Sequence, residues 1–149
     1  MAKKPVTEAA KKANRHQVIH RLVHENKIRT QQQLADLLSE AGFACTQTTV
    51  SRDIANLHLT KSKGKYYVFE EDLRLERLAA EMVYSVEDAG HIVVFKTRGG
   101  AAAGVAGALD EAHLEGALGT VAGDDTIMLV TKTPEAAQVI AKTIEGFID

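Results

Sequence analysis

Cysteine, tryptophan and proline are scarce in this chain of 149 residues, and long hydrophobic runs are missing. The single cysteine, Cys45, excludes an internal disulfide framework and a cysteine-based zinc cluster, and it favours the reducing cytoplasm as the compartment. Since no apolar stretch approaches membrane-spanning length and the amino terminus lacks a signal-peptide core, we expect neither insertion nor secretion. The overall composition, 45% hydrophobic and 26% charged, is typical of one medium or two small globular domains.

A formal net charge of −2 conceals a strong asymmetry between the two halves of the chain. Residues 1–69 hold 12 lysines and arginines against 5 aspartates and glutamates, a net of +7. Residues 70–149 hold 6 against 15, a net of −9. This split predicts a basic domain over 1–69, a candidate for nucleic-acid binding, a helical linker over 70–80 and an acidic domain over 81–149. Each domain is small enough for its core to be marginal, which favours oligomerisation.

The basic domain shows the pattern of a winged helix-turn-helix. Residues 1–12 are polar and lack periodicity, and we expect them to form a mobile basic arm. Thr30 and Gln33 form a capping-box signature at the start of a second helix that Gly42 ends, and Thr46 is a suitable N-cap for a third. The expected elements are helices over about residues 13–25, 30–42 and 46–57, and a hairpin over 59–69.

The third helix has the polar face expected of a DNA-reading helix. If Val50, Ile54 and Leu57 point inward, the advance of about 100° per residue leaves Arg52 outside and Asp53 closer to the core. Arginine can bind guanine edges or phosphate, and lysines on a hairpin tip can contact the phosphate backbone. The candidate DNA-binding residues are Thr48, Ser51, Arg52, Asn56, Lys61, Lys63 and Lys65. A solvated helix with solubilising lysines is the alternative for any single residue, but the joint pattern favours DNA.

Two other features of the basic domain could carry chemistry. His16, His20 and His24 follow one another at four-residue spacing and could line up as metal ligands. Because metal sites need convergent ligands and a supporting shell, we interpret them as a solvated or phosphate-adjacent helix face and expect no metal. Cys45 has no evident catalytic partner, and we expect it to be a small buried residue between the second and third helices.

The acidic domain has the element order ββαββα, which predicts an α+β sandwich with helices on one face of an antiparallel sheet. The expected strands cover residues 82–86, 92–95, 118–122 and 126–131, with a turn over 87–90. One helix is expected to end near Ala112, and Thr133 and Pro134 are typical of the start of the last helix. The expected buried residues of that helix are Ala136, Val139, Ile140, Ile144 and Phe147.

The most informative segment of the acidic domain is Gly-Thr-Val-Ala-Gly-Asp-Asp-Thr-Ile over residues 119–127. It places the adjacent carboxylates of Asp124 and Asp125 on a turn, where they must be solvated, bound to a metal or paired with a cation. An exposed turn, a divalent-metal site and a cationic ligand all remain open. Gly99 and Gly100 precede a helix whose first amides could bind a carboxylate, so the two features together fit a basic amino acid. No nucleophile–base set, P-loop or GxGxxG is present, and we do not expect an enzyme.

The segment Thr-Thr-Val-Ser-Arg-Asp-Ile over 48–54, together with the 119–127 segment, resembles the bacterial arginine repressor family over nearly the whole chain. The resemblance implies a cytoplasmic homohexamer, a dimer of trimers, that binds L-arginine between trimers as co-repressor and needs no other cofactor. It implies that the amino-terminal domains bind palindromic double-stranded DNA operators and repress arginine biosynthesis genes, with Ser51 and Arg52 reading the operator.

The same resemblance implies which residues bind the ligand. The implied arginine-binding residues are Asp110, Thr120, Asp124, Asp125 and Ala103. At residues 99–103 this chain has Gly-Gly-Ala-Ala-Ala where the family usually has Pro-Gly-x-Ala-Gln, so Ala103 lacks one side-chain hydrogen bond to the ligand. This departure leaves open a DNA-binding regulator of the same architecture that responds to another small molecule. A metabolic enzyme or metal-binding module that uses Asp124 and Asp125 is a separate alternative.

Overall fold

A computed structural model of the chain describes residues 7–148. These residues divide into two compact units, one that ends at Glu70 and one that begins at Glu71. Among their helices, none is long and apolar enough to cross a membrane.

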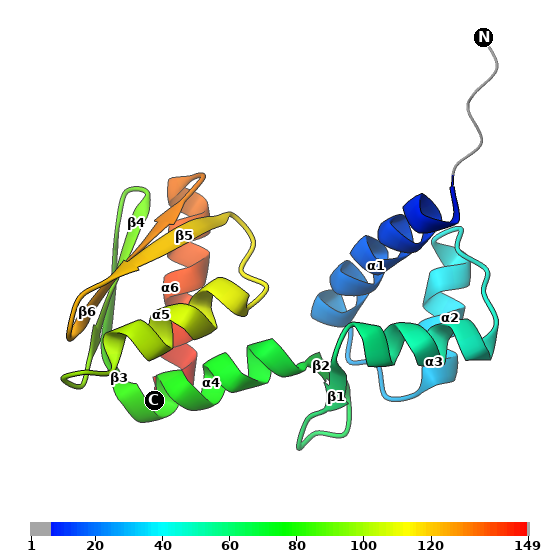
Figure 1. The fold of residues 1–149 in the computed structure, drawn as a ribbon, viewed down its shortest axis with the longest axis horizontal. Coiled ribbons are helices and arrows are strands. Elements are labelled where there is room, and N and C mark those ends of the chain that lie inside the picture. Colours follow the sequence, from blue (N-terminus) through cyan, green and yellow to red (C-terminus); the bar gives the residue numbers. More distant parts are fainter. Residues whose placement is uncertain (1–6, 149) are drawn as a thin grey trace, which may run out of the picture. The chain divides into compact units, whose positions relative to one another are not determined.

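The first unit consists of three helices followed by an antiparallel hairpin (Figure 1). Its elements are α1 (Glu8–Glu25), α2 (Gln31–Glu40), α3 (Gln47–Asn56), β1 (Leu59–Lys61) and β2 (Tyr67–Phe69). Ile19, Leu34, Leu38, Val50 and Phe69 are buried together, so each helix and the hairpin contribute to one core. The expectation of three helices and a hairpin in this part of the chain is therefore confirmed.

The start of α1 differs from the sequence expectation. The helix begins at Glu8, so the prediction of a mobile arm is wrong for residues 8–12, while residues 1–6 lie outside the described part of the chain. Thr7 Oγ1 accepts a hydrogen bond from the Ala10 N–H at 3.1 Å. Glu8 places a negative charge in the first turn, where it interacts favourably with the helix dipole. These polar end signals extend the helix beyond its hydrophobic periodicity.

The predicted ends of α2 and α3 are confirmed. Thr30 Oγ1 accepts from the Gln33 N–H at 3.1 Å, and Gln33 Oε1 accepts from the Thr30 N–H at 3.2 Å, which completes the capping box. Gly42 follows α2 with a φ of +91°, a backbone conformation that glycine adopts without a steric penalty. Thr46 caps α3 by accepting from the Thr49 N–H at 3.2 Å.

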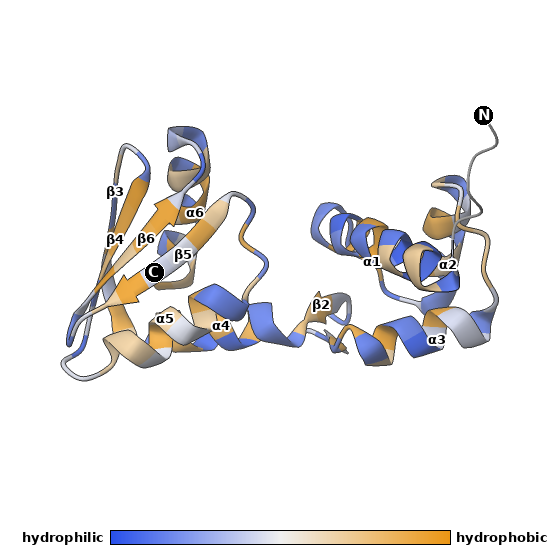
Figure 2. Cartoon of the chain, turned by 45° about the horizontal axis from the view of Figure 1, so that its top comes forward, coloured by the Kyte–Doolittle hydropathy of each residue, from blue (hydrophilic) through white to orange (hydrophobic). Residues whose placement is uncertain are grey.

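The second unit is the predicted α+β arrangement. Its elements are α4 (Glu70–Met82), β3 (Val83–Ala89), β4 (Ile92–Thr97), α5 (Ala102–Glu111), β5 (Ala117–Ala122), β6 (Thr126–Thr131) and α6 (Pro134–Ile148). The strands form an antiparallel sheet in the order β3-β4-β6-β5. Val93, Phe95, Ile127 and Leu129 on one face pack into a core with residues of α5 and α6. Figure 2 shows β4 and β6 as mostly hydrophobic, in contrast to α1 of the first unit.

The turn between β3 and β4 is tighter than expected. The sequence predicted a turn over residues 87–90, but β3 continues through Ala89, which pairs with Ile92. Glu87 and Asp88 pair with Val94 and Val93 within the sheet. Since β3 is an edge strand and both acidic side chains are exposed, their charges are tolerated there.

The buried stripe of α6 also differs from the expected one. Ile140 and Ile144 are buried as predicted, whereas the side chain of Val139 is 65% exposed and Ala136 and Phe147 are only half-buried. The remaining fully buried residues are Ala137 and Ala141. Small side chains allow a helix to approach the sheet closely, so the face with two alanines packs inward in place of the face with the larger valine.

Candidate functional site

The residues expected to contact DNA lie on the surface of the first unit. Thr48, Ser51, Arg52 and Asn56 of α3 are all exposed. On the opposite side of α3, Val50 and Asp53 are buried, and Ile54 and Leu57 are half-buried. The helix therefore presents a guanidinium, two hydroxyls and an amide on one side, which is a suitable set for phosphates and base edges.

The hairpin adds a second basic group next to its turn. Lys61, Lys63 and Lys65 are exposed, as predicted, and Lys61 Nζ lies 5.3 Å from the centre of the Tyr67 ring. A Cβ at Gly64 would lie 2.5 Å from the Tyr66 ring, so glycine is needed for this ring to pack on the turn. The lysines are thus carried on a turn that has a defined side-chain packing.

Two further cations lie beside the hairpin turn, although neither was among the residues expected to contact DNA. Arg29 Nη1 donates to the carbonyl of Gly64 at 3.4 Å, and Lys27 Nζ lies 5.5 Å from the centre of the Tyr66 ring. The Tyr67 N–H donates to the carbonyl of Ile28 at 2.8 Å, which holds the segment between α1 and α2 beside β2. Residues 27–29 and 64–67 are far apart in the sequence, so their contact could not be predicted from it. The apolar Ile28 between two cations is only a weak signal that this segment packs beside a strand.

A buried charge cluster joins α1 to α3. The Asp53 side chain is 1% exposed, and its carboxylate accepts from Arg15 Nε, from Arg15 Nη2 at 2.9 Å and from His16 Nε2 at 2.8 Å. Burial raises the pKa of the Asp53 carboxyl, but the hydrogen bonds and charges of Arg15 and His16 outweigh it, so this pKa lies below its ordinary value. The hydrogen bond to Asp53 in turn raises the pKa of Arg15. The signal for these partners is Asp53 itself, since a carboxylate on a core-facing position requires a cation.

The three histidines of α1 do not share one set of partners. His16 contacts Asp53, whereas the rings of His20 and His24 stack on Phe69 with centroid distances of 4.4 and 5.4 Å. His24 Nδ1 also lies 2.8 Å from the carbonyl oxygen of His20. His16 therefore belongs to the charge cluster at Asp53, whereas His20 and His24 both pack on Phe69.

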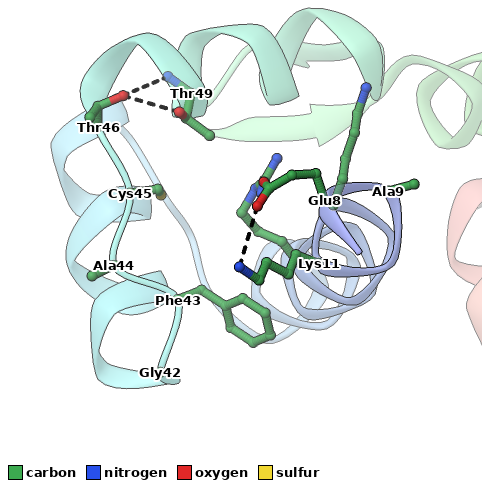
Figure 3. A pocket seen from close by; sticks show the side chains of 11 residues that line it. Glu8, Ala9, Lys11, Gly42, Phe43, Ala44, Cys45, Thr46 and Thr49 are labelled. Atoms are coloured by element: carbon green, nitrogen blue, oxygen red, sulfur yellow. Dashed lines mark hydrogen bonds and ion pairs between the residues drawn. The ribbon is translucent and has the colours of Figure 1, made fainter. Parts of the chain in front are cut away.

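Cys45 lines an open pocket of about 750 Å³ between α1 and the α2–α3 turn (Figure 3). Its side chain is half-buried, so the expectation of a buried cysteine is wrong: the turn leaves one side of the residue facing the pocket. Burial raises the pKa of the Cys45 thiol, and the nearby charge of Arg15 only partly opposes this. The thiol is therefore predominantly neutral at physiological pH.

The Asp124–Asp125 turn of the second unit is exposed, and its backbone is firmly held. The carbonyl of Asp124 accepts from the Gly100 and Ala102 N–H groups at 3.1 and 3.3 Å, and the carbonyl of Asp125 accepts from the Thr97 N–H at 2.8 Å. Two of the amides expected to be free for a ligand are thus used to fix this turn. The side chains of both aspartates remain at the surface.

A hydrogen-bonded chain orients the carboxylate of Asp125. Lys96 Nζ donates to Thr126 Oγ1 at 2.8 Å, and Thr126 Oγ1 donates to Asp125 Oδ1 at 2.9 Å. The Asp124 side chain lies beside Gly99, whose added Cβ would be 3.7 Å from Asp124 Oδ2. Two carboxylates on a rigid turn form a site of negative charge suited to a cationic group.

The other expected ligand residues lie elsewhere on α5 and β5. Thr120 Oγ1 is 3.0 Å from each carboxylate oxygen of Asp110, and both residues line a cavity of about 90 Å³ beneath β5. Ala103 is exposed in the first turn of α5, and the N-cap residue Ala101 provides no side-chain cap. The structure therefore pairs Asp110 with Thr120 and separates them from the turn that carries Asp124.

Within one chain these two groups lie at opposite ends of α5. Ala102, at its start, hydrogen-bonds to Asp124, and Asp110 lies near its end. At a rise of about 1.5 Å per residue, the helix separates the two ends by about 12 Å. The resemblance implies that all of these residues line one pocket between trimers, and within one chain they form two separate groups.

Comparisons with known proteins cover both units. The family described as "Arginine repressor, DNA binding domain" matches residues 10–75, and "Arginine repressor, C-terminal domain" matches residues 79–146. Proteins named Arginine repressor from Carboxydothermus hydrogenoformans and Thermus thermophilus are 40% and 38% identical in alignments that cover 92% of this chain and 99% and 90% of those proteins. One from Alkaliphilus metalliredigens is 41% identical over 139 residues, 87% of this chain and 93% of that protein. The chain is a member of the arginine repressor family.

Proposed function

We propose that the protein is an arginine-dependent transcriptional regulator that binds palindromic operators and represses genes of arginine biosynthesis. The observation that carries this proposal is the combination, in one chain, of an exposed basic α3–hairpin surface with a rigid, exposed pair of carboxylates. The first surface suits DNA and the second suits a cationic effector. Membership of the arginine repressor family supports both assignments.

On the DNA side, α3 acts as the recognition helix of a winged helix-turn-helix and the hairpin acts as its wing. Arg52 and Ser51 lie on the exposed face, where they can reach base edges in the major groove. Lys61, Lys63 and Lys65 contact the phosphate backbone, which provides affinity and salt dependence with little sequence discrimination. The palindromic operator follows from a symmetric assembly that presents pairs of these helices.

On the effector side, Asp124 and Asp125 bind the cationic groups of L-arginine. Asp110 and Thr120 lie near the other end of α5 from Asp124 within the same chain. Following the family resemblance, Asp110 and Thr120 are assigned to the ligand from a neighbouring subunit. Arginine is accordingly a ligand of the interface in a dimer of trimers.

The sheet provides an apolar surface for this assembly. Val121, Met128 and Val130 lie on the face opposite the core, and Val121 is 71% exposed. Val121 and Met128 are cross-strand partners, and Met128 also pairs with Val94. An apolar row of this kind favours burial against another subunit. A cationic ligand beside Asp124 and Asp125 would then reduce the repulsion between acidic units, since residues 70–149 carry a net charge of −9.

Titration calorimetry with L-arginine on the full chain tests the effector assignment. Asp125→Asn removes one carboxylate charge while keeping its shape, and we expect at least a tenfold loss of arginine affinity. Asp88→Asn is the matched control, since it removes an exposed carboxylate from β3 of the same unit and leaves the affinity within twofold. Equal affinities of the wild type and Asp125→Asn would contradict the assignment.

A second effector identity is favoured by one observation, the exposed alanine at position 103, where the family resemblance implies a glutamine side chain. The pocket would then accept a different cationic amino acid. Thermal unfolding in the presence of L-arginine, L-lysine, L-ornithine and L-citrulline distinguishes these cases. The largest stabilisation by arginine supports the first assignment, and a larger one by another amino acid supports the second.

A further inference from the structure

We infer that Arg15 and His16 are positioning residues that set the rotation of the recognition helix by holding the buried carboxylate of Asp53. This inference rests on the proposed function, because it assigns a role in operator reading to side chains that face away from the DNA. Its structural basis is the charge cluster between α1 and α3.

The position of Asp53 within α3 makes it suited to this role. It follows Arg52 directly, and it is buried with Val50 on the core side of the helix, whereas Ser51 and Arg52 are exposed. Because the residues of a helix keep fixed angles to one another, holding the direction of Asp53 also fixes the directions of Ser51 and Arg52.

The apolar contacts of α3 fix its rotation less well than the charge cluster at Asp53 does. Val50 is its fully buried apolar residue, and Ile54 and Leu57 are half-buried. Apolar burial has no preferred direction, whereas a bidentate guanidinium–carboxylate pair has a defined plane and hydrogen-bond geometry. Arg15 supplies this two-point contact, and His16 adds a third hydrogen bond to the same carboxylate.

A small rotation is sufficient to disrupt base reading. An atom about 6 Å from the helix axis moves by about 2 Å when the helix turns by 20°. Hydrogen bonds to base edges tolerate donor–acceptor distances over a range of only about 0.5 Å. Loss of the cluster should therefore reduce sequence discrimination, while phosphate contacts from the hairpin lysines continue to provide non-specific affinity.

The test measures the affinity of the full-length chain for two DNA duplexes. The first is a duplex selected from a random-sequence library by the wild type in the presence of L-arginine, and the second is a scrambled duplex of the same base composition. All affinities are measured well below the unfolding temperature of each variant. The readout is the ratio of the two affinities, because a loss of folded protein lowers both together and leaves their ratio unchanged.

We expect Arg15→Lys, which keeps the charge and loses the two-point contact, to lower the affinity ratio at least tenfold. His16→Ala should lower it at least threefold, and His16→Gln, whose amide can still donate to Asp53, should stay within twofold of the wild type. Arg21→Lys on the exposed side of α1 is the matched control and should leave the ratio unchanged. If Arg15→Lys does not fold, the affinity ratios of His16→Ala and His16→Gln test the inference by themselves.

An unchanged ratio in folded Arg15→Lys and His16→Ala would overturn the inference while leaving the proposed function intact. The same holds if His16→Gln loses as much discrimination as His16→Ala. If the wild type enriches no sequence from the library, the proposed function fails, and the inference fails with it.

Discussion

At the scale of single residues, the first unit keeps its charges in two environments with different roles. Arg52 is exposed on α3 and free to meet a nucleic acid, whereas its neighbour Asp53 is buried and compensated by Arg15 and His16. A carboxylate beside the arginine proposed to read DNA would repel phosphate if it were exposed. Its burial removes that repulsion and turns the charge into a contact between helices.

The lowered pKa of Asp53 predicts a pH-dependent stability. A carboxyl group whose pKa is lower in the folded than in the unfolded state, where it is about 3.9, stabilises the fold above that pH and loses this contribution as the pH falls through the lower folded value. Asp53→Asn should therefore lower the free energy of unfolding by about 2 kcal/mol at pH 7. The difference between variant and wild type should shrink below about pH 4.

Urea unfolding followed by circular dichroism at several pH values from 7 down to 3 measures this difference. Asp36→Asn on α2 serves as the control, since Asp36 is exposed and has an exposed hydrogen bond to Gln32. We expect the control to change stability by less than about 0.5 kcal/mol. A difference for Asp53→Asn that stays constant over the whole pH range would contradict the ionic role of this carboxylate.

At the scale of elements, helix ends and close contacts determine where the second unit places its surfaces. Gly116 precedes β5 with a φ of +83°, and a Cβ on it would lie 2.6 Å from the Cβ of Ala136 in α6. This close approach sets the packing of α6 near the start of β5. The strand that carries Thr120 therefore depends on a glycine outside the proposed ligand site.

Gly116→Ala should destabilise the second unit by about 2 kcal/mol, because the substitution combines a strained backbone with a steric overlap. Gly146→Ala within α6 is the matched control: beyond the neighbouring helix backbone, the added Cβ meets nothing within 4 Å, so the higher helix propensity of alanine should stabilise by up to about 1 kcal/mol. Thermal unfolding of both variants provides the comparison. Equal unfolding temperatures for the two variants would contradict a steric overlap between residue 116 and Ala136.

Local signals in the sequence were sufficient to predict most elements. The capping box at Thr30 and the N-cap Thr46 placed α2 and α3, since these interactions involve residues only three apart. The rotation of α6 could not be predicted, because it depends on how closely Ala137 and Ala141 allow the helix to approach the sheet. The start of α1 was missed because the cap at Thr7 precedes any hydrophobic repeat.

Less of the candidate site than of the fold could be predicted from the sequence. The exposed residues of α3 follow from helical periodicity, whereas the partners of Asp53 lie 37 and 38 positions earlier in the chain. Similarly, Asp110 and Thr120 are hydrogen-bonded, but the separation of this pair from Asp124 depends on the direction of α5 along the sheet. Contacts of this kind are determined by tertiary packing and leave no local pattern.

At the scale of the whole molecule, the two units divide the proposed function between them. The amino-terminal part carries the positive charge and the surface suited to DNA, and the carboxy-terminal part carries the negative charge and the surface suited to a cationic effector. In the proposed assembly, an effector bound in the second unit influences DNA binding by fixing the spacing of the first units. The central claim is therefore a coupling between arginine binding and operator binding.

Fluorescence anisotropy of a labelled palindromic duplex, selected by the wild type and titrated with the full chain with and without L-arginine, tests this coupling most directly. We predict that saturating arginine increases the affinity for this duplex at least tenfold. Arg52→Ala should lose the preference for it over a scrambled duplex while still binding arginine in calorimetry. Equal affinity of the wild type for the duplex with and without arginine would contradict the account.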